Sequence, residues 1–225
     1  MEAVILCGGL GTRLRSVLPD RPKCLAPVNG KTYLDHITSF LERQGIERIV
    51  FATGYLSGQV REWLSAVKGS WEGVISEEPE RLGTGGALRL ASTKINSPDF
   101  FALNGDTFLD MDYKAFMDFH LSSPTDITLA VTHVTDAARF GCLEMEGDAV
   151  VRFREKGAAQ SGLVNAGVYA VRRNFIAGYP HTCFSLEHDV LSDSKKCFRG
   201  YRVEGGFIDI GTPASFEKCG EHLNV

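Results

Sequence analysis

The sequence lacks the features that would assign it to a membrane or nucleic-acid class. No apolar run approaches the roughly 18 residues that a membrane-spanning helix requires, and the N-terminus has neither a basic region nor a cleavage site. The net charge of -4 at pH 7 argues against general nucleic-acid binding, because clustered Lys and Arg hold a phosphate backbone. We therefore expect a cytoplasmic protein with neither a membrane nor a nucleic acid as its partner.

Cysteine and histidine are present, but not at the spacings that metal sites need. The histidines form no His-x-x-x-His or His-Glu-x-x-His pair, so metal-hydrolase chemistry has no support. The cysteines form no Cys-x-x-Cys pair, which disfavours a zinc site and leaves no compact disulfide framework. We expect reduced thiols at Cys7, Cys24, Cys142, Cys183, Cys197 and Cys219.

A glycine cluster near the N-terminus matches neither of two common phosphate-binding loops, since it is not Gly-x-Gly-x-x-Gly and does not end in Gly-Lys-Ser/Thr. The cluster, Gly8, Gly9 and Gly11, follows the apolar run Ala3–Cys7, which suits a buried strand. Glycines let the backbone turn with its N–H groups exposed, and such donors bind anions. The cluster is therefore a candidate phosphate site, although it also fits an ordinary strand-to-helix turn.

Charged residues after the cluster favour the phosphate interpretation. Arg13 can hold two phosphate oxygens in a planar fork, and Lys23, on a backbone stiffened by Pro22, adds a mobile point charge. Residues 1–31 contain five cations against two acids, although the whole chain is net negative. The combination of glycines, Arg13 and Lys23 predicts a phosphate site of another geometry.

The apolar pattern predicts an α/β fold. Helical spacing alternates with short strand-like runs as far as Phe108, which indicates a mostly parallel sheet with helices on both faces and a ligand crevice at the carboxyl ends of its strands. Beyond that point strands dominate, as a mixed extension of the same sheet. We predict one domain over 1–225 with two functional halves, 1–110 and 111–225. Helices are expected around 34–41, 60–67, 87–91, 113–121, 186–191 and 213–219, and strands around 48–52, 73–76, 100–103, 127–134, 142–145, 150–153 and 163–171.

Two aspartates are candidate ligands for a hard metal. Asp106 follows Asn104 and Gly105 at the end of a predicted strand, and Asp209 lies among apolar residues just before a predicted helix. Oxygen donors suit Mg²⁺, which bridges carboxylates to phosphates. Asp209 fits a helix cap or a buried hydrogen bond equally well on spacing alone.

These motifs together resemble the signature of the sugar-1-phosphate nucleotidyltransferases. Residues 8–14 match Gly-Gly-x-Gly-Thr-Arg-Leu, residues 22–28 match Pro-Lys-x-Leu-x-Pro-Val, and Asn-Gly-Asp and Asp-Ile-Gly-Thr-Pro follow in the same order. The resemblance covers the whole chain. It implies a Rossmann-like, three-layer, glycosyltransferase-A-like fold in which 1–110 bind a nucleotide and 111–225 a sugar phosphate. It also implies that Asp106 and Asp209 share Mg²⁺, and it allows a homodimer.

The activity that this resemblance implies is attack of a sugar 1-phosphate on the α-phosphorus of a nucleoside triphosphate, with release of pyrophosphate. A phosphate monoester is largely ionised at neutral pH, so no general base is required. The catalytic residues implied are Arg13, Lys23, Asp106 and Asp209. The residues implied to bind the nucleotide are Leu10, Gly11, Thr12, Arg13, Lys23, Glu78, Gly83, Thr84 and Asp106.

The resemblance also assigns a set of sugar-phosphate contacts. They are Asn104, Gly141, Glu155, Lys156, Asn165, Gly167 and Glu187. Gly157 stands where the family usually has proline after the Glu155-Lys156 pair. Judged without the family, that pair fits a surface ion pair, Asn165 to Gly167 a strand with a bulge, and Glu187 an ordinary helix start.

The residues also narrow the identity of the nucleotide base and of the sugar. Glu78 lies where the family places the residue that reads the base, and an ionised carboxylate can accept from both adjacent donors of guanine, so GTP is the expected substrate. Leu82–Ala87 and the ending Phe207–Asp209 are most similar to the short heptose-1-phosphate guanylyltransferases, with mannose-1-phosphate guanylyltransferases as runner-up. A non-catalytic nucleotide-sugar sensor is the alternative of another class. A solvated acidic loop is the plain alternative for Glu78.

Overall fold

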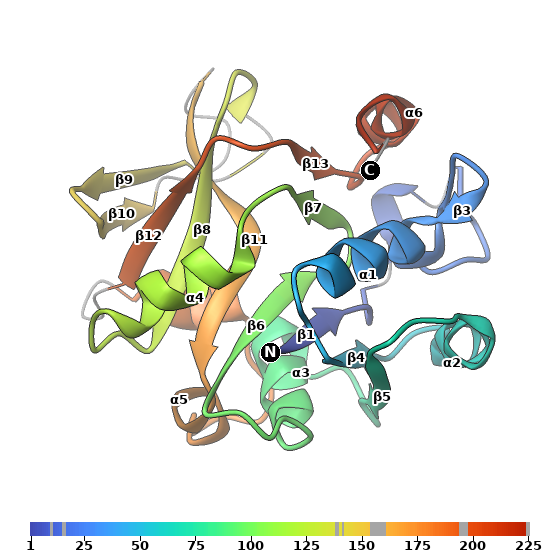
Figure 1. The fold of residues 1–225 in the computed structure, drawn as a ribbon, viewed down its shortest axis with the longest axis horizontal. Helices are drawn as coiled ribbons and strands as arrows, with labels where there is room; N and C mark the ends of the chain where they lie inside the picture. Colours follow the sequence, from blue (N-terminus) through green and yellow to red (C-terminus); the bar gives the residue numbers. More distant parts are fainter. Residues whose placement is uncertain are drawn as a thin grey trace.

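The computed structural model describes residues 1–225 except 10, 15–16, 138–139, 141, 154–160, 194–197 and 224–225. Its centre is a nine-stranded sheet in the order β5-β4-β1-β6-β11-β8-β12-β10-β9 (Figure 1). The strands are β1 (Glu2–Leu6), β4 (Arg48–Thr53), β5 (Glu72–Glu77), β6 (Asp99–Asn104), β8 (Ile127–Val134), β9 (Leu143–Glu146), β10 (Ala149–Phe153), β11 (Gly162–Arg172) and β12 (Phe198–Val203).

The pairings of this sheet confirm a mixed arrangement in which most strands share one direction. β5, β4, β1 and β6 are parallel, and β8 and β12 are parallel to each other. β11 lies antiparallel between β6 and β8, and β10 lies antiparallel between β12 and β9. The other strands therefore share one direction, and their carboxyl ends meet at one edge of the sheet.

Helices cover both faces of the sheet, which gives the three layers expected (Figure 1). Residues of α1 (Tyr33–Arg43), α2 (Ser57–Ala66) and α4 (Tyr113–Leu121) belong to the core on one face. Residues of α3 (Gly83–Ser92), α5 (Arg173–Ala177) and the π-helix η4 (Leu186–Leu191) belong to the core on the other. A last helix, α6 (Pro213–His222), follows the final strand. No helix in the described ranges is long and apolar enough to span a membrane.

The first strand shows why the sequence folds this way. Ala3 and Ile5 belong to the core on one face, whereas Val4 belongs to the core on the other. A strand buried on both faces needs a continuous apolar run rather than alternation, as found here. The following helix α1 has a capping box, in which Thr32 Oγ1 accepts from Asp35 N–H and Asp35 accepts from Thr32 N–H, so its first turn is fixed by local residues.

Short elements that the apolar pattern did not predict lie outside the main sheet. β7 (Thr107–Leu109) and β13 (Phe207–Asp209) form a separate antiparallel pair, which Figure 1 shows between α1 and the last helix. β7 pairs with β13 and does not return along β6. The remaining elements are the 3-10 helices η1 (Thr12–Leu14) and η2 (Lys23–Leu25) and the hairpin of β2 (Pro27–Val28) with β3 (Lys31–Thr32).

Candidate active site

A cleft of about 1280 Å³ opens at the carboxyl edge of the sheet, where the crevice was predicted. It is lined by the glycine loop after β1, by the ends of β4 and β6, by the middle of β11, and by residues of η4. Predicted site residues that line it are Gly11, Arg13, Lys23, Glu78, Gly83, Thr84, Asn104, Asp106, Asn165, Gly167, Glu187 and Asp209. The fold therefore gathers residues from both halves of the chain around one space.

The glycine loop approaches the lysine that follows it. Gly11 has φ +60°, a conformation that side chains rarely adopt, and a Cβ atom there would lie 3.1 Å from Lys23 Cγ. Glycine at this position thus lets the loop close over the stem of Lys23. Arg13, on η1, is exposed and lines the cleft beside the loop. The glycine loop and both cations therefore lie on one wall.

Lys23 contacts the first of the two aspartates directly. Its Nζ lies 3.0 Å from Asp106 Oδ2, and both side chains are only partly exposed, at 17% and 28%. η2 presents this lysine, since the buried side chains of Cys24 and Leu25 fix the turn in the core. The ammonium supplies the positive charge that the Asp106 carboxylate would otherwise lack in a partly buried site.

The pairing of β7 with β13 brings the second aspartate beside the first. Thr107 is the register partner of Asp209, and Ile210 N–H donates to the backbone oxygen of Asp106 at 3.0 Å. Asp209 does not cap α6, because Thr212 accepts the capping hydrogen bond from Ser215 N–H. Asp209 Oδ1 instead accepts from Gly211 N–H at 3.0 Å. The two carboxylates are held by backbone pairing, without dependence on a ligand.

A buried tyrosine, Tyr33, is affected by the charges of both aspartates. Tyr33 lies fully buried and its hydroxyl donates to Ile208 O at 3.3 Å. Burial raises the pKa of Tyr33 well above its ordinary value, and the negative charges of Asp106 and Asp209 raise it further. Both aspartates are therefore close enough to act on one hydroxyl.

The donor set at this point fits a hard divalent cation. Among the described residues no three His, Cys, Asp or Glu side chains cluster as a metal site. Two carboxylates are nevertheless what Mg²⁺ uses when waters and substrate phosphates complete its coordination. A cation already contacts Asp106 Oδ2, namely the Lys23 ammonium. The oxygen chemistry of Asp106 and Asp209 thus matches Mg²⁺ and offers no soft ligand.

The end of the cleft near α3 carries the predicted base reader. Glu78 Oε2 accepts from Leu82 N–H at 3.1 Å, so one carboxylate oxygen fixes the turn into α3. The other, Oε1, lies against the backbone at Gly8 and Gly54, where a Cβ atom would collide with it. Gly83 begins α3, and Thr84 Oγ1 accepts from Leu186 N–H at 2.9 Å. Glu78 is therefore held in place, with part of its accepting capacity used by the protein.

The opposite wall carries the predicted sugar contacts of β11. Asn165 Nδ2 donates to Tyr169 Oη at 2.8 Å, and Asn165 Oδ1 accepts from Gly167 N–H at 3.0 Å. The strand pairing shifts register between Asn165 and Tyr169, so the predicted bulge is present. Gly167 has φ +68°, and a Cβ atom there would lie 2.6 Å from Asn104 Nδ2. An amide can make four hydrogen bonds, so Asn165 keeps capacity for a ligand.

The π-helix η4 forms the third wall. Its i→i+5 bond runs from Ser192 N–H to Glu187 O at 3.0 Å. Glu187, His188, Leu191 and Ser192 all line the cleft, and the negative charge of Glu187 adds to the effect of burial in raising the pKa of Tyr169. Glu187 was predicted to contact the sugar, whereas His188 and Ser192 were not identified. A wide helical turn that aims these side chains into one cleft has no signature in apolar spacing.

Other lining residues were also missed. Arg81, Phe140 and Phe153 line the cleft from loops or strand ends. Arg81 lies between Glu78 and Gly83 and could have been suspected from that position. The predicted residues Leu10, Gly141, Glu155 and Lys156, and the side chain of Thr12, lie outside what the structure describes, as does Cys197. The other cysteines are free thiols, as expected.

Comparison with known proteins gives the family of the chain. Residues 2–223 match the family described as nucleotidyl transferase, and the chain belongs to that family. It is 35% identical over 99% of its length to D-glycero-alpha-D-manno-heptose 1-phosphate guanylyltransferase of Aneurinibacillus thermoaerophilus, of which 98% is covered. It is also 35% identical to the Campylobacter jejuni protein of the same name, with 96% of this chain and 97% of that one covered.

A solved structure gives the same relation in three dimensions. HddC from Yersinia pseudotuberculosis, complexed with GMP-PN, superimposes with a TM-score of 0.90 at 34% sequence identity, with 99% of each chain covered. The nucleotidyltransferase fold and class predicted from the motifs are therefore confirmed.

Proposed function

We propose that the chain transfers GMP from GTP to D-glycero-alpha-D-manno-heptose 1-phosphate, releasing pyrophosphate and forming a nucleotide-sugar for surface polysaccharide synthesis. The observation that carries the proposal is that Asp106, Asp209, Lys23 and Arg13 line one cleft together. Similarity to two relatives named for this reaction supports the choice of sugar and base.

The reaction is a displacement at phosphorus. An oxygen of the sugar 1-phosphate attacks the α-phosphorus of GTP, a new P–O bond forms, and the bond to the β-phosphate breaks so that pyrophosphate leaves with the electron pair. The attacking phosphate is already ionised at neutral pH, and accordingly the site needs no base. What the protein must supply is positioning of two anions and neutralisation of their charge.

The described residues divide this work between them. Arg13 holds the departing pyrophosphate in a bidentate contact, while Lys23 moves from Asp106 to the α-phosphate as charge develops there. Asp106 and Asp209 would hold Mg²⁺, which neutralises phosphate charge and orients the reacting groups when bound. Glu78 accepts from guanine, and Gly83 and Thr84 lie against the nucleotide. The outlying assignments Leu10, Thr12, Gly141, Glu155 and Lys156 stay proposals from the resemblance.

The sugar lies between β11 and η4 in this proposal. Asn165 offers its remaining N–H and lone pair to a hydroxyl, Glu187 accepts from another, and Gly167 allows close approach beside Asn104. We further propose that residues 1–110 bind the nucleotide and 111–225 the sugar phosphate within one domain. A cytoplasmic location and a homodimer stay predictions from the sequence.

A panel of sugar 1-phosphates against GTP, UTP and dTTP, with pyrophosphate release as readout, tests the proposal. We expect the highest kcat/KM for GTP with the heptose 1-phosphate. A preference for mannose 1-phosphate would reassign the sugar, and a preference for UTP would reassign the base. Nucleotide-sugar binding without any turnover would make the chain a sensor.

A further inference from the structure

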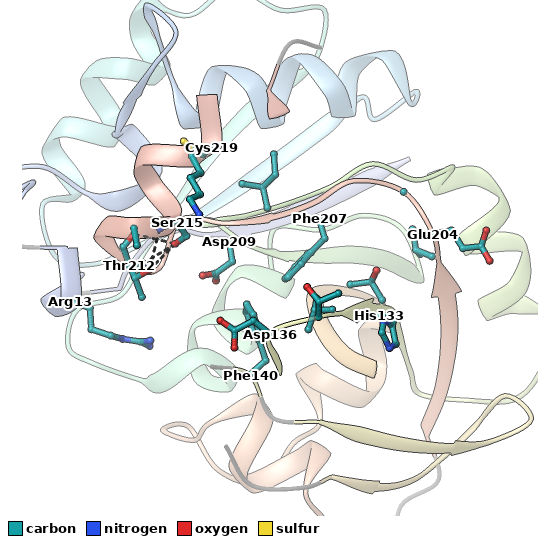
Figure 2. Close-up of a pocket in the computed structure, with 18 residues that line it drawn as sticks. Arg13, His133, Asp136, Phe140, Glu204, Phe207, Asp209, Thr212, Ser215 and Cys219 are labelled. Carbon is teal, nitrogen blue, oxygen red and sulfur yellow. Dashed lines mark hydrogen bonds between the residues drawn. The ribbon is translucent and has the colours of Figure 1, made fainter. Parts of the chain in front are cut away.

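A second hollow, of about 970 Å³, adjoins the active-site cleft. Four residues line both spaces, so the two adjoin at these side chains: Arg13, Phe140, Phe207 and Asp209. The hollow is bounded by the ends of β8 and β12, by β13 and by one side of α6. Figure 2 shows the carboxylates of Asp136 and Asp209 extending into it from facing walls, with the ring of Phe207 beside them.

Two aromatic rings stand where the hollow meets the cleft. The ring centroids of Phe140 and Phe207 are 5.5 Å apart at 63°, and both residues pack against the small cluster of Ala137, Cys142 and Val164. Both rings also line the active-site cleft together with Asn165 and Gly167, on the wall that holds the sugar in our proposal. Atoms that extend from that sugar toward Phe140 and Phe207 would therefore enter the second hollow.

The walls of the hollow suit hydroxyl groups on an uncharged chain. Asp136, Glu204 and Asp209 are carboxylates that accept hydrogen bonds, whereas Arg13 and Lys218 are donors. With three carboxylates against two cations, the hollow does not favour a second anion. Apolar surface from the two phenylalanines adds the contact that C–H groups need, a mixture typical of small-molecule pockets.

We propose that this hollow receives the C6–C7 diol end of the sugar and selects a heptose over a hexose, with Asp136 accepting from the hydroxyl on C7. The inference rests on the proposed function, since it assigns one end of the same substrate. A hexose 1-phosphate lacks one carbon and its hydroxyl, so it would leave this contact unmade. Asp136 is a specificity residue here, and the chemistry at phosphorus does not involve it.

A larger side chain on α6 can fill the second hollow without entering the active-site cleft. Ala214 is exposed, lies in the first turn of α6 and lines the hollow but not the cleft. We expect Ala214→Phe to lower kcat/KM for the heptose 1-phosphate by about tenfold or more, as for other pocket contacts of one carbon. The KM for GTP and the kcat/KM for mannose 1-phosphate should stay unchanged. Glu217→Phe, on the same helix but outside the hollow, is the matched control and should alter none of these.

A second variant tests the hydroxyl contact itself. Asp136→Asn should lower kcat/KM for the heptose substrate by about tenfold while leaving mannose 1-phosphate and GTP unaffected. Equal losses for both sugars, or no loss for the heptose in either variant, would overturn the inference while leaving guanylyl transfer intact. A wild-type enzyme that releases no pyrophosphate from GTP with either sugar would instead overturn the proposed function, and this inference with it.

Discussion

Lys23 Nζ lies 3.0 Å from Asp106 Oδ2, so the lysine that we propose for the reacting phosphate contacts a carboxylate that we propose for the metal. The two residues lie 83 positions apart in the chain and meet because η2 and the end of β6 share one edge of the sheet. In a partly buried site each charge reduces the cost of burying the other. The contact therefore holds these two side chains together at the edge of the cleft where we propose that the phosphates react.

Lys23→Ala should lower kcat roughly a hundredfold, because an oriented charge at the reacting phosphate is lost. Pyrophosphate release at saturating GTP and sugar 1-phosphate measures this. Lys31→Ala removes an exposed lysine of β3 and should change nothing. An effect confined to KM would assign Lys23 to ground-state binding rather than to the transition state.

Asp106→Asn should remove most Mg²⁺-dependent turnover and leave the fold intact, since the backbone pairing around Asp106 does not use its carboxylate. Activity across a Mg²⁺ titration, with circular dichroism for the fold, measures both. Asp118→Asn alters an exposed carboxylate of α4 and serves as the control. Normal metal dependence in the Asp106 variant would refute its role as a metal ligand.

Glu78→Gln should narrow or reverse the preference for GTP over UTP, because the amide places a donor where guanine needs an acceptor. The amide oxygen can still accept from Leu82 N–H, so the turn into α3 should persist. Glu80→Gln changes an exposed neighbour outside the cleft and is the matched control. Unchanged selectivity in the Glu78 variant would show that the base is read elsewhere.

His120 should make the fold sensitive to acid. It is buried, Nδ1 lies 2.8 Å from Thr128 Oγ1, and Nε2 lies 3.3 Å from Asp99 Oδ1. Burial lowers its pKa below 6.5, and nearby Arg172 and Arg199 lower it further, although Asp99 opposes the shift. The folded state thus favours the neutral form of His120 more strongly than the unfolded state does.

Because the pKa of His120 is lower in the folded state than in the unfolded state, neutral His120 contributes stability at pH values above the unfolded-state pKa. That stability is lost as the pH falls below about 6.5. Thermal unfolding of the wild type between pH 7.5 and pH 5 should therefore show a falling midpoint. His120→Gln should show a flatter profile, whereas His181→Gln, an exposed control, should follow the wild type. Identical profiles for all three would remove His120 as the cause.

Local patterns predicted the fold because they coincide with what the core needs. The stripe of Leu34, Ile37, Phe40 and Leu41 is the buried face of α1, and the run 127–134 is β8. Three-residue strands such as β7 and β13 carry too little pattern to be seen, since their pairing depends on partners distant in sequence. The segment of η4 was expected as an ordinary helix. Its π form could not be predicted, because the i→i+5 bond depends on tertiary packing.

The site followed from motifs more than from periodicity. Asp106 and Lys23 were assigned by their neighbours in sequence, and the structure brings them into contact. The sequence could not predict the hydrogen bond between Asn165 and Tyr169, nor the second hollow beside Phe207. Each depends on how separate parts of the chain meet in the fold. Sequence gives the chemistry of single residues, whereas shape arises when distant elements meet.

Shared metal binding by Asp106 and Asp209 is the central feature of the proposed guanylyl transfer. The decisive measurement is pyrophosphate release from GTP and the heptose 1-phosphate across a Mg²⁺ titration, for wild type and Asp209→Asn. We expect release that requires both substrates and Mg²⁺ in the wild type, and a loss of roughly a hundredfold or more in the variant. Turnover by Asp209→Asn at the wild-type rate and with the same Mg²⁺ dependence would contradict it.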